Sequence, residues 1–194
     1  MQSARLVHLS EQEYLEAELK GEVRHEYVAG QVFAMVGASR AHNRVSGNVY
    51  SRLLAHLRGG PCEVFMSDVK VRVPRMSAYY YPDIVVTCDP RDRTANEGYV
   101  VKTPSLIIEV LSHSTEAIDR REKLLAYQTL ESLKEYALIS QSHQGVEIYR
   151  RADAGWEVEQ LVPGDPVRFA SLDITLSFEQ VYEESEIPRD PVKE

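Results

Sequence analysis

Apolar and polar residues recur along the chain at two spacings, and each spacing predicts a type of element. Val45, Val49 and Leu53 follow the period of an amphipathic helix, so we expect a helix from Ser39 to about Leu57. A capping box, Ser10 to Glu13, predicts an earlier helix over Glu13–Leu19. Strand-like alternation predicts strands at 22–28, 31–36, 63–66, 69–73, 84–87, 136–139, 146–149 and 156–161.

The run Ser105–Leu111 differs because it is apolar on both faces except at Glu109, which is typical of a central strand. A helix capped by Ser114 or Thr115 is predicted after it, ending near Leu130. The connecting and terminal segments are expected to be a hairpin turn at 29–30, a tyrosine-rich loop at 74–81, a polar loop at 89–98 and a short closing helix at 178–184. The pattern predicts one mixed α/β (α+β) domain over residues 1–185, with a mobile charged tail at 186–194.

Composition narrows the class of protein. The 194 residues are 43% hydrophobic and 27% charged, which excludes a fibrous repeat and wholesale disorder. No secretory core or long apolar run is visible, so we expect a cytoplasmic protein whose two cysteines, Cys62 and Cys88, are reduced. The net charge of −8 does not suggest a basic nucleic-acid binder, although clustered acids also form sites for divalent cations.

Two acids carry the strongest chemical signal. Glu109 lies inside an apolar strand, where a buried carboxylate is costly unless it is paired or bound to metal. Asp83 begins another apolar strand after Pro82, and two carboxylates about 4–5 Å apart are a minimum for Mg²⁺. Each acid alone is better explained by a structural partner, such as a buried arginine or backbone amides, whereas the pair favours a site.

Lys123 is the third candidate. It lies two turns into the predicted helix, and helical side chains lean back toward the N-terminus, here toward the end of the strand that carries Glu109. Its ammonium group could therefore reach the acids and orient a water molecule. An ordinary surface pair between Asp119 and Lys123 explains the same spacing equally well.

Four further residues are weaker candidates. His42 could contact phosphate or be a hydrogen-bonded structural histidine, and Asp119 could hold Lys123 or lie on the helix surface. Asp68 and Lys70 share one side of a predicted strand, so they could line a cleft or form a charge pair. Three consecutive tyrosines, Tyr79 to Tyr81, could stack on bases, but core packing is the better interpretation.

Three blocks of sequence resemble one known family. The segments YYYPDIVVTCDP, TPSLIIEVLSHSTEAIDRREKLLAYQTLESLKEYALIS and RHEYVAGQVFAMVGASRAHN are similar to the Uma2 (Uma-two) restriction endonuclease family of the PD-(D/E)xK nuclease superfamily. The similarity runs from about Leu9 to Tyr182. It implies a restriction-endonuclease-like fold, in which helices flank a central mixed β-sheet and a divalent metal binds at the sheet edge.

The resemblance also implies roles for individual residues. Asp83 matches the aspartate of the family's PD element, Glu109 the second-strand acid, and Lys123 the lysine on the following helix. Glu26 matches an N-terminal acid that completes the site directly or through water. The wider superfamily carries its lysine two residues after the acid, where this chain has Leu111, so the lysine must come from elsewhere.

Two functions follow as expectations. The first is an endonuclease that hydrolyses DNA with Mg²⁺ or Mn²⁺ and acts as a homodimer. The second is a nuclease-fold module without catalysis that binds nucleic acid or protein, in which Glu109 and Lys123 are only a buried ion pair. A glycosidase-type acid pair at Asp83 and Glu109 ranks last, because no aromatic platform for a sugar is evident.

Overall fold

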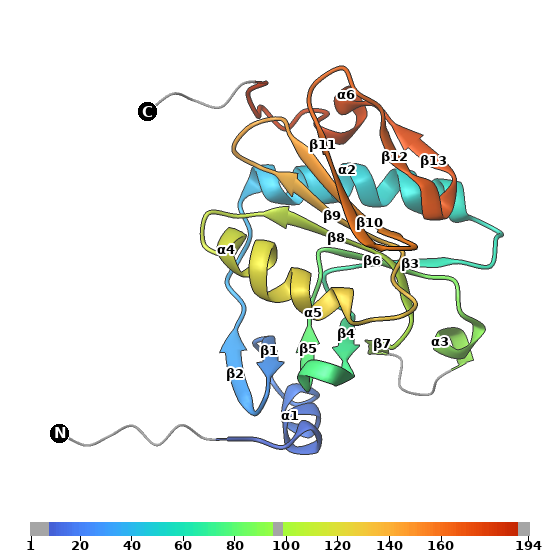
Figure 1. Ribbon diagram of the computed structural model, residues 1–194. Helices are drawn as coiled ribbons and strands as arrows, with labels where there is room; N and C mark the ends of the chain where they lie inside the picture. Colours follow the sequence, from blue (N-terminus) through green and yellow to red (C-terminus); the bar gives the residue numbers. More distant parts are fainter. Residues whose placement is uncertain (1–7, 95–98, 190–194) are drawn as a thin grey trace.

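The computed structural model describes residues 8–94 and 99–189, and these form two sheets with helices between and around them (Figure 1). The helices are α1 (Glu11–Glu18), α2 (Arg40–Leu57), α3 (Pro90–Thr94), α4 (Glu116–Ile118), α5 (Leu124–Gln128) and α6 (Phe178–Val181). The strands are β1 (His25–Val28), β2 (Gln31–Ala34), β3 (Glu63–Met66), β4 (Lys70–Val73), β5 (Ala78–Tyr80), β6 (Ile84–Thr87), β7 (Val100–Val101), β8 (Pro104–Leu111), β9 (Glu135–Ser140), β10 (Val146–Ala152), β11 (Gly155–Leu161), β12 (Val167–Phe169) and β13 (Ile174–Leu176).

The larger sheet has six strands in the order β11-β10-β9-β8-β6-β3. All eight residues of β8 are buried, as its apolar pattern predicts, and it pairs parallel with β9 and antiparallel with β6. The second sheet has the order β2-β1-β5-β4-β7, and β12 and β13 form a separate ribbon. This mixed-sheet architecture with flanking helices is the predicted fold class.

Apolar side chains fill the spaces between these layers. One cluster joins α2, α6 and the β12–β13 ribbon to one face of the six-stranded sheet, through residues such as Val49, Ile108 and Phe169. A second cluster joins the other face to α5 and the five-stranded sheet, through residues such as Ile107 and Tyr127. The two sheets therefore meet across a packed interior, and the chain passes from one to the other at residues 81–83, between β5 and β6.

Two predicted loops contain regular structure. Residues 74–81 form a 3₁₀ turn and then β5, whose three residues are all buried, so the loop prediction is wrong there. The tyrosine side chains of this segment are core residues, as the preferred interpretation held. The polar loop at 89–98 begins with the short helix α3, and residues 95–98 lie outside the described part.

The predicted helix from Ser114 or Thr115 to Leu130 is instead three short pieces. Between α4 and α5, residues Asp119–Lys123 form a π-helical turn. Thr115 occupies the N-cap position, but its side chain makes no capping hydrogen bond, so the predicted cap is wrong. A π turn changes the direction of the side chains that follow it, and such turns are frequent at functional sites.

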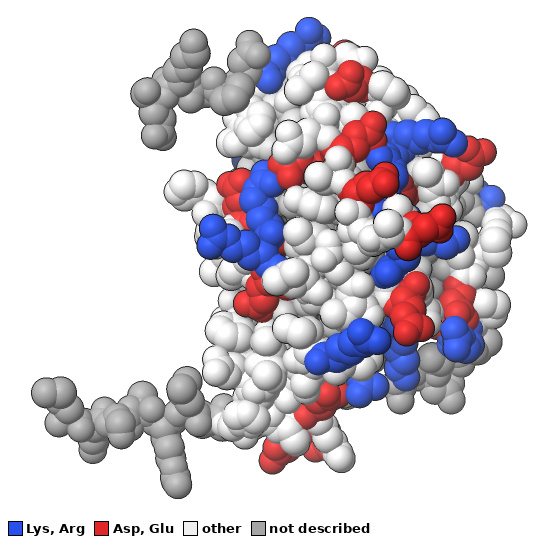
Figure 2. Space-filling model, viewed as in Figure 1, with Lys and Arg blue, Asp and Glu red and all other residues white. Residues whose placement is uncertain are grey.

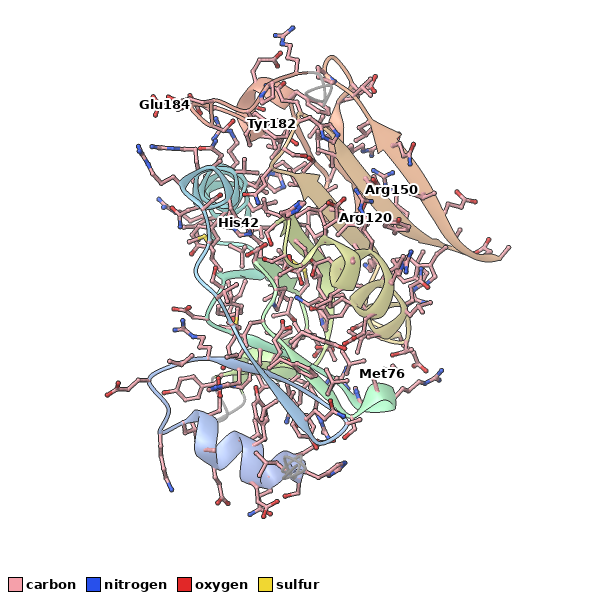
Figure 3. The ribbon with its side chains drawn as sticks, turned by 90° about the vertical axis from the view of Figure 1, so that its left-hand side faces the viewer. His42, Met76, Arg120, Arg150, Tyr182 and Glu184 are labelled. Carbon is pink, nitrogen blue, oxygen red and sulfur yellow. A yellow bond between two sulfur atoms is a disulfide. The ribbon has the colours of Figure 1, made fainter. Side chains whose placement is uncertain are left out.

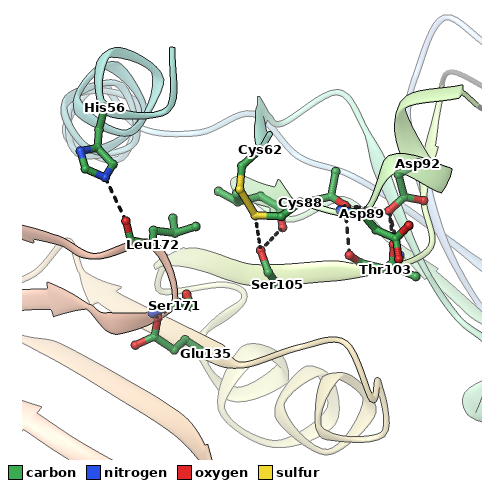
Figure 4. The surroundings of a disulfide bond; sticks show 12 residues. His56, Cys62, Cys88, Asp89, Asp92, Thr103, Ser105, Glu135, Ser171 and Leu172 are labelled. Atoms are coloured by element: carbon green, nitrogen blue, oxygen red, sulfur yellow. Dashed lines mark hydrogen bonds between the residues drawn. A yellow bond between two sulfur atoms is a disulfide. The ribbon is translucent and has the colours of Figure 1, made fainter. Parts of the chain in front are cut away.

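The expectation of reduced cysteines is also wrong in this structure. Cys62 precedes β3 and Cys88 follows β6, and the paired residues Glu63 and Thr87 of these strands bring the two sulfur atoms into a disulfide bond (Figure 4). Ser105 Oγ lies 3.6 Å from the Cys88 sulfur. The bond therefore fastens one edge of the six-stranded sheet, a constraint that pattern alone does not reveal.

The expected mobile tail is partly fixed. Ile187 is buried, and Gln144 donates hydrogen bonds to the carbonyl oxygens of Ile187 and Pro188. Residues 190–194 of the predicted tail lie outside the described residues. Within the described ranges, no helix has the length and apolar character needed to span a bilayer.

Candidate active site

Asp83 and Glu109 lie side by side because β6 and β8 are neighbours. Ile84 pairs with Ile108, which brings Asp83, one residue before β6, opposite Glu109. The Asp83 backbone N–H donates to Glu109 Oε2 at 3.2 Å, and the Val110 N–H donates to Asp83 Oδ2 at 2.7 Å. The sheet register thus brings the two predicted acids together.

Lys123 reaches these acids from the π turn. Its Nζ lies 3.1 Å from Glu109 Oε1 and donates a hydrogen bond to it. The same Nζ is 3.2 Å from Asp119 Oδ1, an atom that accepts no well-formed hydrogen bond within the described structure. The Asp119–Lys123 pair is therefore buried and part of the site, not on the helix surface.

Glu26 arrives from the other sheet. Its Oε1 is 3.0 Å from Lys123 Nζ and accepts a hydrogen bond from the Tyr81 N–H at 3.2 Å. β1 and β5 are adjacent strands of the five-stranded sheet, so the segment that leads into Asp83 also fixes Glu26. The site lies at the seam between the two sheets, and residues from four distant parts of the chain form it.

His42, at the start of α2, brings a fifth segment of the chain to the site. Ser39 caps α2 by accepting from the His42 N–H, which fixes this residue at the start of the helix. His42 Nε2 lies 3.1 Å from Asp83 Oδ2, and the side view places the residue between α2 and the helical segment that follows β8 (Figure 3). Burial lowers the pKa of His42, but the hydrogen bond and charge of Asp83 outweigh burial and raise that pKa above its ordinary value. This contact with Asp83 agrees with the structural alternative for His42.

Exposure divides the site into a floor and a mouth. The side chains of Glu109 and Lys123 are 4% and 7% exposed, whereas those of Glu26 and Asp83 are 17% and 18% exposed. A ligand from solvent would therefore meet Asp83 and Glu26 first. Glu109 and Lys123 lie deeper, so they would contact only a ligand that enters the pocket.

The charges in this pocket do not balance. Burial raises the pKa of Glu109 well above its usual range, and the charges of Asp119, Asp83 and Glu26 raise it further, against the lowering effect of Lys123. Burial lowers the pKa of Lys123, but the carboxylates of Glu109, Glu26 and Asp119 outweigh it and hold that pKa well above normal. Four acids share one ammonium group and the His42 imidazole, so acids outnumber cationic groups in the pocket and a metal cation would offset the difference.

Three tyrosines support the floor and escaped the sequence analysis as site residues. Tyr127 donates to Glu109 Oε1 at 3.3 Å, and Tyr136 donates to the Asp119 carbonyl oxygen at 3.1 Å. The Lys123 ammonium lies 5.6 Å from the centre of the Tyr80 ring. Tyr127 is four residues after Lys123, so helical spacing alone could have identified it.

Asp68 and Lys70 each have a partner other than the four acids described above. Asp68 is exposed and pairs with Arg24 at 3.0 Å. Lys70 is buried and donates to Tyr81 Oη at 3.0 Å. The two residues thus have separate partners in this structure, and their lining of a cleft stays a prediction.

The donor atoms suit a hard divalent cation. Across residues 8–94 and 99–189 no three His, Cys, Asp or Glu side chains are arranged to hold a metal ion. Mg²⁺, however, is commonly held by one or two carboxylates, with water and phosphate oxygens as its other ligands. Asp83 and Glu109 provide two such carboxylates in a pocket with excess negative charge, so the residues present fit this metal.

Several known proteins are similar in sequence to this chain. The model of the Uma2 family, described as "Putative restriction endonuclease", matches residues 11–179. An uncharacterized protein of Synechocystis sp., slr1290, is 35% identical over 181 residues, covering 93% of this chain and 94% of that protein. A second Synechocystis protein, sll1609, is 34% identical over 155 residues, covering 79% of this chain and 88% of that protein.

A solved structure shares the fold. The crystal structure of "a putative nuclease belonging to DUF820" from Anabaena variabilis superposes with a TM-score of 0.74 at 19% identity, covering 90% of this chain and 97% of that chain. At this identity the likeness concerns the fold alone, which is a restriction-endonuclease-like arrangement. Together with the family match over residues 11–179, these findings show that the chain belongs to the Uma2 family of restriction-endonuclease-like proteins.

Proposed function

We propose that this protein is a metal-dependent endonuclease that hydrolyses phosphodiester bonds in DNA, with Mg²⁺ or Mn²⁺ as cofactor. The observation that carries the proposal is the contact of Lys123 Nζ with Glu109 Oε1 at 3.1 Å, directly beside Asp83. A buried lysine next to two acids on neighbouring strands replaces the lysine that the superfamily carries at the position of Leu111.

Each residue has a role in this proposal. Asp83 and Glu109 would hold the cation, and Glu26 would assist directly or through water. A bound divalent cation would polarise a phosphate oxygen and acidify the attacking water. Lys123 orients that water and offsets the negative charge that develops on the phosphate. His42 and Asp119 position Asp83 and Lys123 through the contacts described above.

The negative net charge does not exclude a DNA substrate, because local charge matters more at a cleft. Arg40 and Arg44 lie in the first turns of α2, the helix that carries His42, and they line a hollow of about 680 Å³ together with Ser39, Asn43 and Asn48. These two residues project from the face of α2 opposite to His42, so DNA phosphates that pass over that face would meet them. A homodimer would present two such sites to the two strands.

Plasmid nicking tests the proposal. Asp83→Ala and Glu109→Gln should each lower the rate of nicking in Mg²⁺ more than about 100-fold, because each removes a cation ligand. Asp153→Ala is the matched control, since Asp153 is an exposed acid in a turn far along the chain. Equal nicking by wild type and Asp83→Ala would overturn the assignment.

A second function is favoured by one observation. Lys123 is satisfied by three carboxylates without any metal, so the same cluster would suit a structural ion-pair network in a binding module without catalysis. Calorimetry with Mn²⁺ separates the two functions. Binding that Asp83→Ala abolishes supports the enzyme, and absence of heat supports the module.

A further inference from the structure

The strand β2 is the outer strand of the five-stranded sheet, and all four of its residues are exposed. It lies at the edge of the molecule beside β1 (Figure 1). Phe33 in this strand is 51% exposed, and with Tyr99 it is one of two exposed aromatic residues in the described ranges. An aromatic ring left in water on an edge strand marks a contact surface.

The sheet register places Phe33 next to the candidate active site. Phe33 pairs directly with Glu26, and residues directly opposite in an antiparallel pair project from the same face of the sheet. Glu26 uses that face to contact Lys123 at 3.0 Å. The Phe33 ring therefore stands beside the mouth of the site, one strand further out.

The other aromatic residues near the site are unavailable to a ligand. Tyr79, Tyr80 and Tyr81 are at most 5% exposed, and Tyr127 and Tyr136 are fully buried. Tyr99 lies in a different region, 5.9 Å from the Lys70 ammonium. Phe33 is thus the aromatic side chain of the described residues that is both exposed and adjacent to Glu26.

We propose that Phe33 stacks on an unpaired base of the nucleic acid next to the phosphate held at the site, which deepens the proposed function and rests on it. Stacking on an aromatic ring does not depend on base identity or on charge. Stacking would therefore add to the attraction between phosphates and local arginines in a chain whose net charge is −8. Figure 2 shows the surface over β1 and β2 with few charged side chains, which suits contact with a base.

The test measures binding of a short single-stranded deoxyoligonucleotide that contains 2-aminopurine, whose fluorescence falls when it stacks. All variants carry Asp83→Asn, so the oligonucleotide stays intact for the binding measurement, and a gel confirms this. Phe33→Ala should raise the Kd about tenfold and remove the quenching. Phe33→Trp should bind like the parent. Val32→Ala on the opposite face of β2 is the matched control and should change neither reading.

The outcomes separate this proposal from the proposed function. Three results would overturn stacking, whatever the nicking assay shows. They are a Kd of Phe33→Ala equal to that of the parent, a rise in Kd for Val32→Ala as large as for Phe33→Ala, and no quenching of 2-aminopurine by the parent. A loss in Phe33→Ala that accompanies a change from dimer to monomer in sedimentation would also overturn it, because β2 would then pair with a second copy. Cleavage of the oligonucleotide by the Asp83→Asn parent would instead count against Asp83 as a ligand of the cation, which belongs to the proposed function. It would leave the stacking result valid.

Discussion

At the residue scale, the proposed function depends on the ammonium group of Lys123 and the acids around it. Lys123 is 14 residues after Glu109 in the chain, yet it donates to that carboxylate in the protein interior. Resemblance and the lean of helical side chains predicted this approach, but spacing alone left a surface pair with Asp119 equally plausible. What decides between them is burial, because both partners of that pair are almost inaccessible.

Removing this charge should cost stability as well as activity. Lys123→Met leaves Glu109 and Asp119 buried without their cation, and we expect the free energy of unfolding at neutral pH to fall by about 3–5 kcal/mol. The double variant Lys123→Met/Glu109→Gln should recover part of this loss, because the amide removes one of the two unpaired charges. Urea denaturation of both variants is the measurement. A double variant no more stable than Lys123→Met would show that the pair is not coupled.

At the element scale, the sequence predicted regular segments well and their interruptions poorly. The helix α2, the central strand β8 and the strands β9 to β11 follow directly from side-chain pattern. The π turn at Asp119–Lys123 does not, because its five residues are all charged and carry no apolar period that would show the extra residue. β5 was missed because it is only three residues long and lies between Pro74 and Pro82, which is too short a run to show strand alternation.

The disulfide bond fastens β3 to β6, the strand that Asp83 begins. Its two cysteines are 26 residues apart, and a loop of that length corresponds to about 3.5 kcal/mol in the chain-entropy model. Cys62→Ser/Cys88→Ser should therefore lower the free energy of unfolding by about 2–4 kcal/mol. The wild type in excess reductant should match the double variant. A free energy of unfolding of the wild type that does not change in reductant would contradict the disulfide bond.

The helix α1 is held to the five-stranded sheet through Glu11. Its carboxylate accepts hydrogen bonds from Ser77 Oγ at 2.8 Å, Tyr79 Oη at 3.0 Å and Arg72 Nη2 at 3.0 Å. Partial burial raises the pKa of Glu11, but these bonds and the Arg72 charge outweigh it, so that pKa lies below the ordinary 4.5.

A depressed pKa in the folded state stabilises the protein above the unfolded value and ceases to do so as pH falls through the folded value. Wild type should therefore lose stability as the pH drops below about 4.5, and Glu11→Gln should lose less over the same interval. Urea midpoints at neutral and acid pH measure this. Parallel losses in both proteins would mean that Glu11 is not responsible.

At the scale of the whole molecule, the site exists because two sheets meet. The larger sheet supplies Asp83 and Glu109, the smaller one supplies Glu26, and the helical segment after β8 supplies Lys123. Sequence identified all four residues through family resemblance, and pattern alone identified only the two acids and the lysine. Pattern alone could not show that Glu26 lies within contact distance of Lys123, because the arrangement of two sheets depends on long-range packing that no local pattern encodes.

The most direct test of this account is a crystal of the protein soaked in Mn²⁺ and measured for anomalous scattering. The account predicts a peak at the mouth of the pocket, about 2.0–2.3 Å from oxygen atoms of both Asp83 and Glu109, with the Lys123 ammonium still against the Glu109 carboxylate. A map with no peak there, in crystals that diffract well enough to show one, would contradict it. So would a peak whose ligands include neither acid.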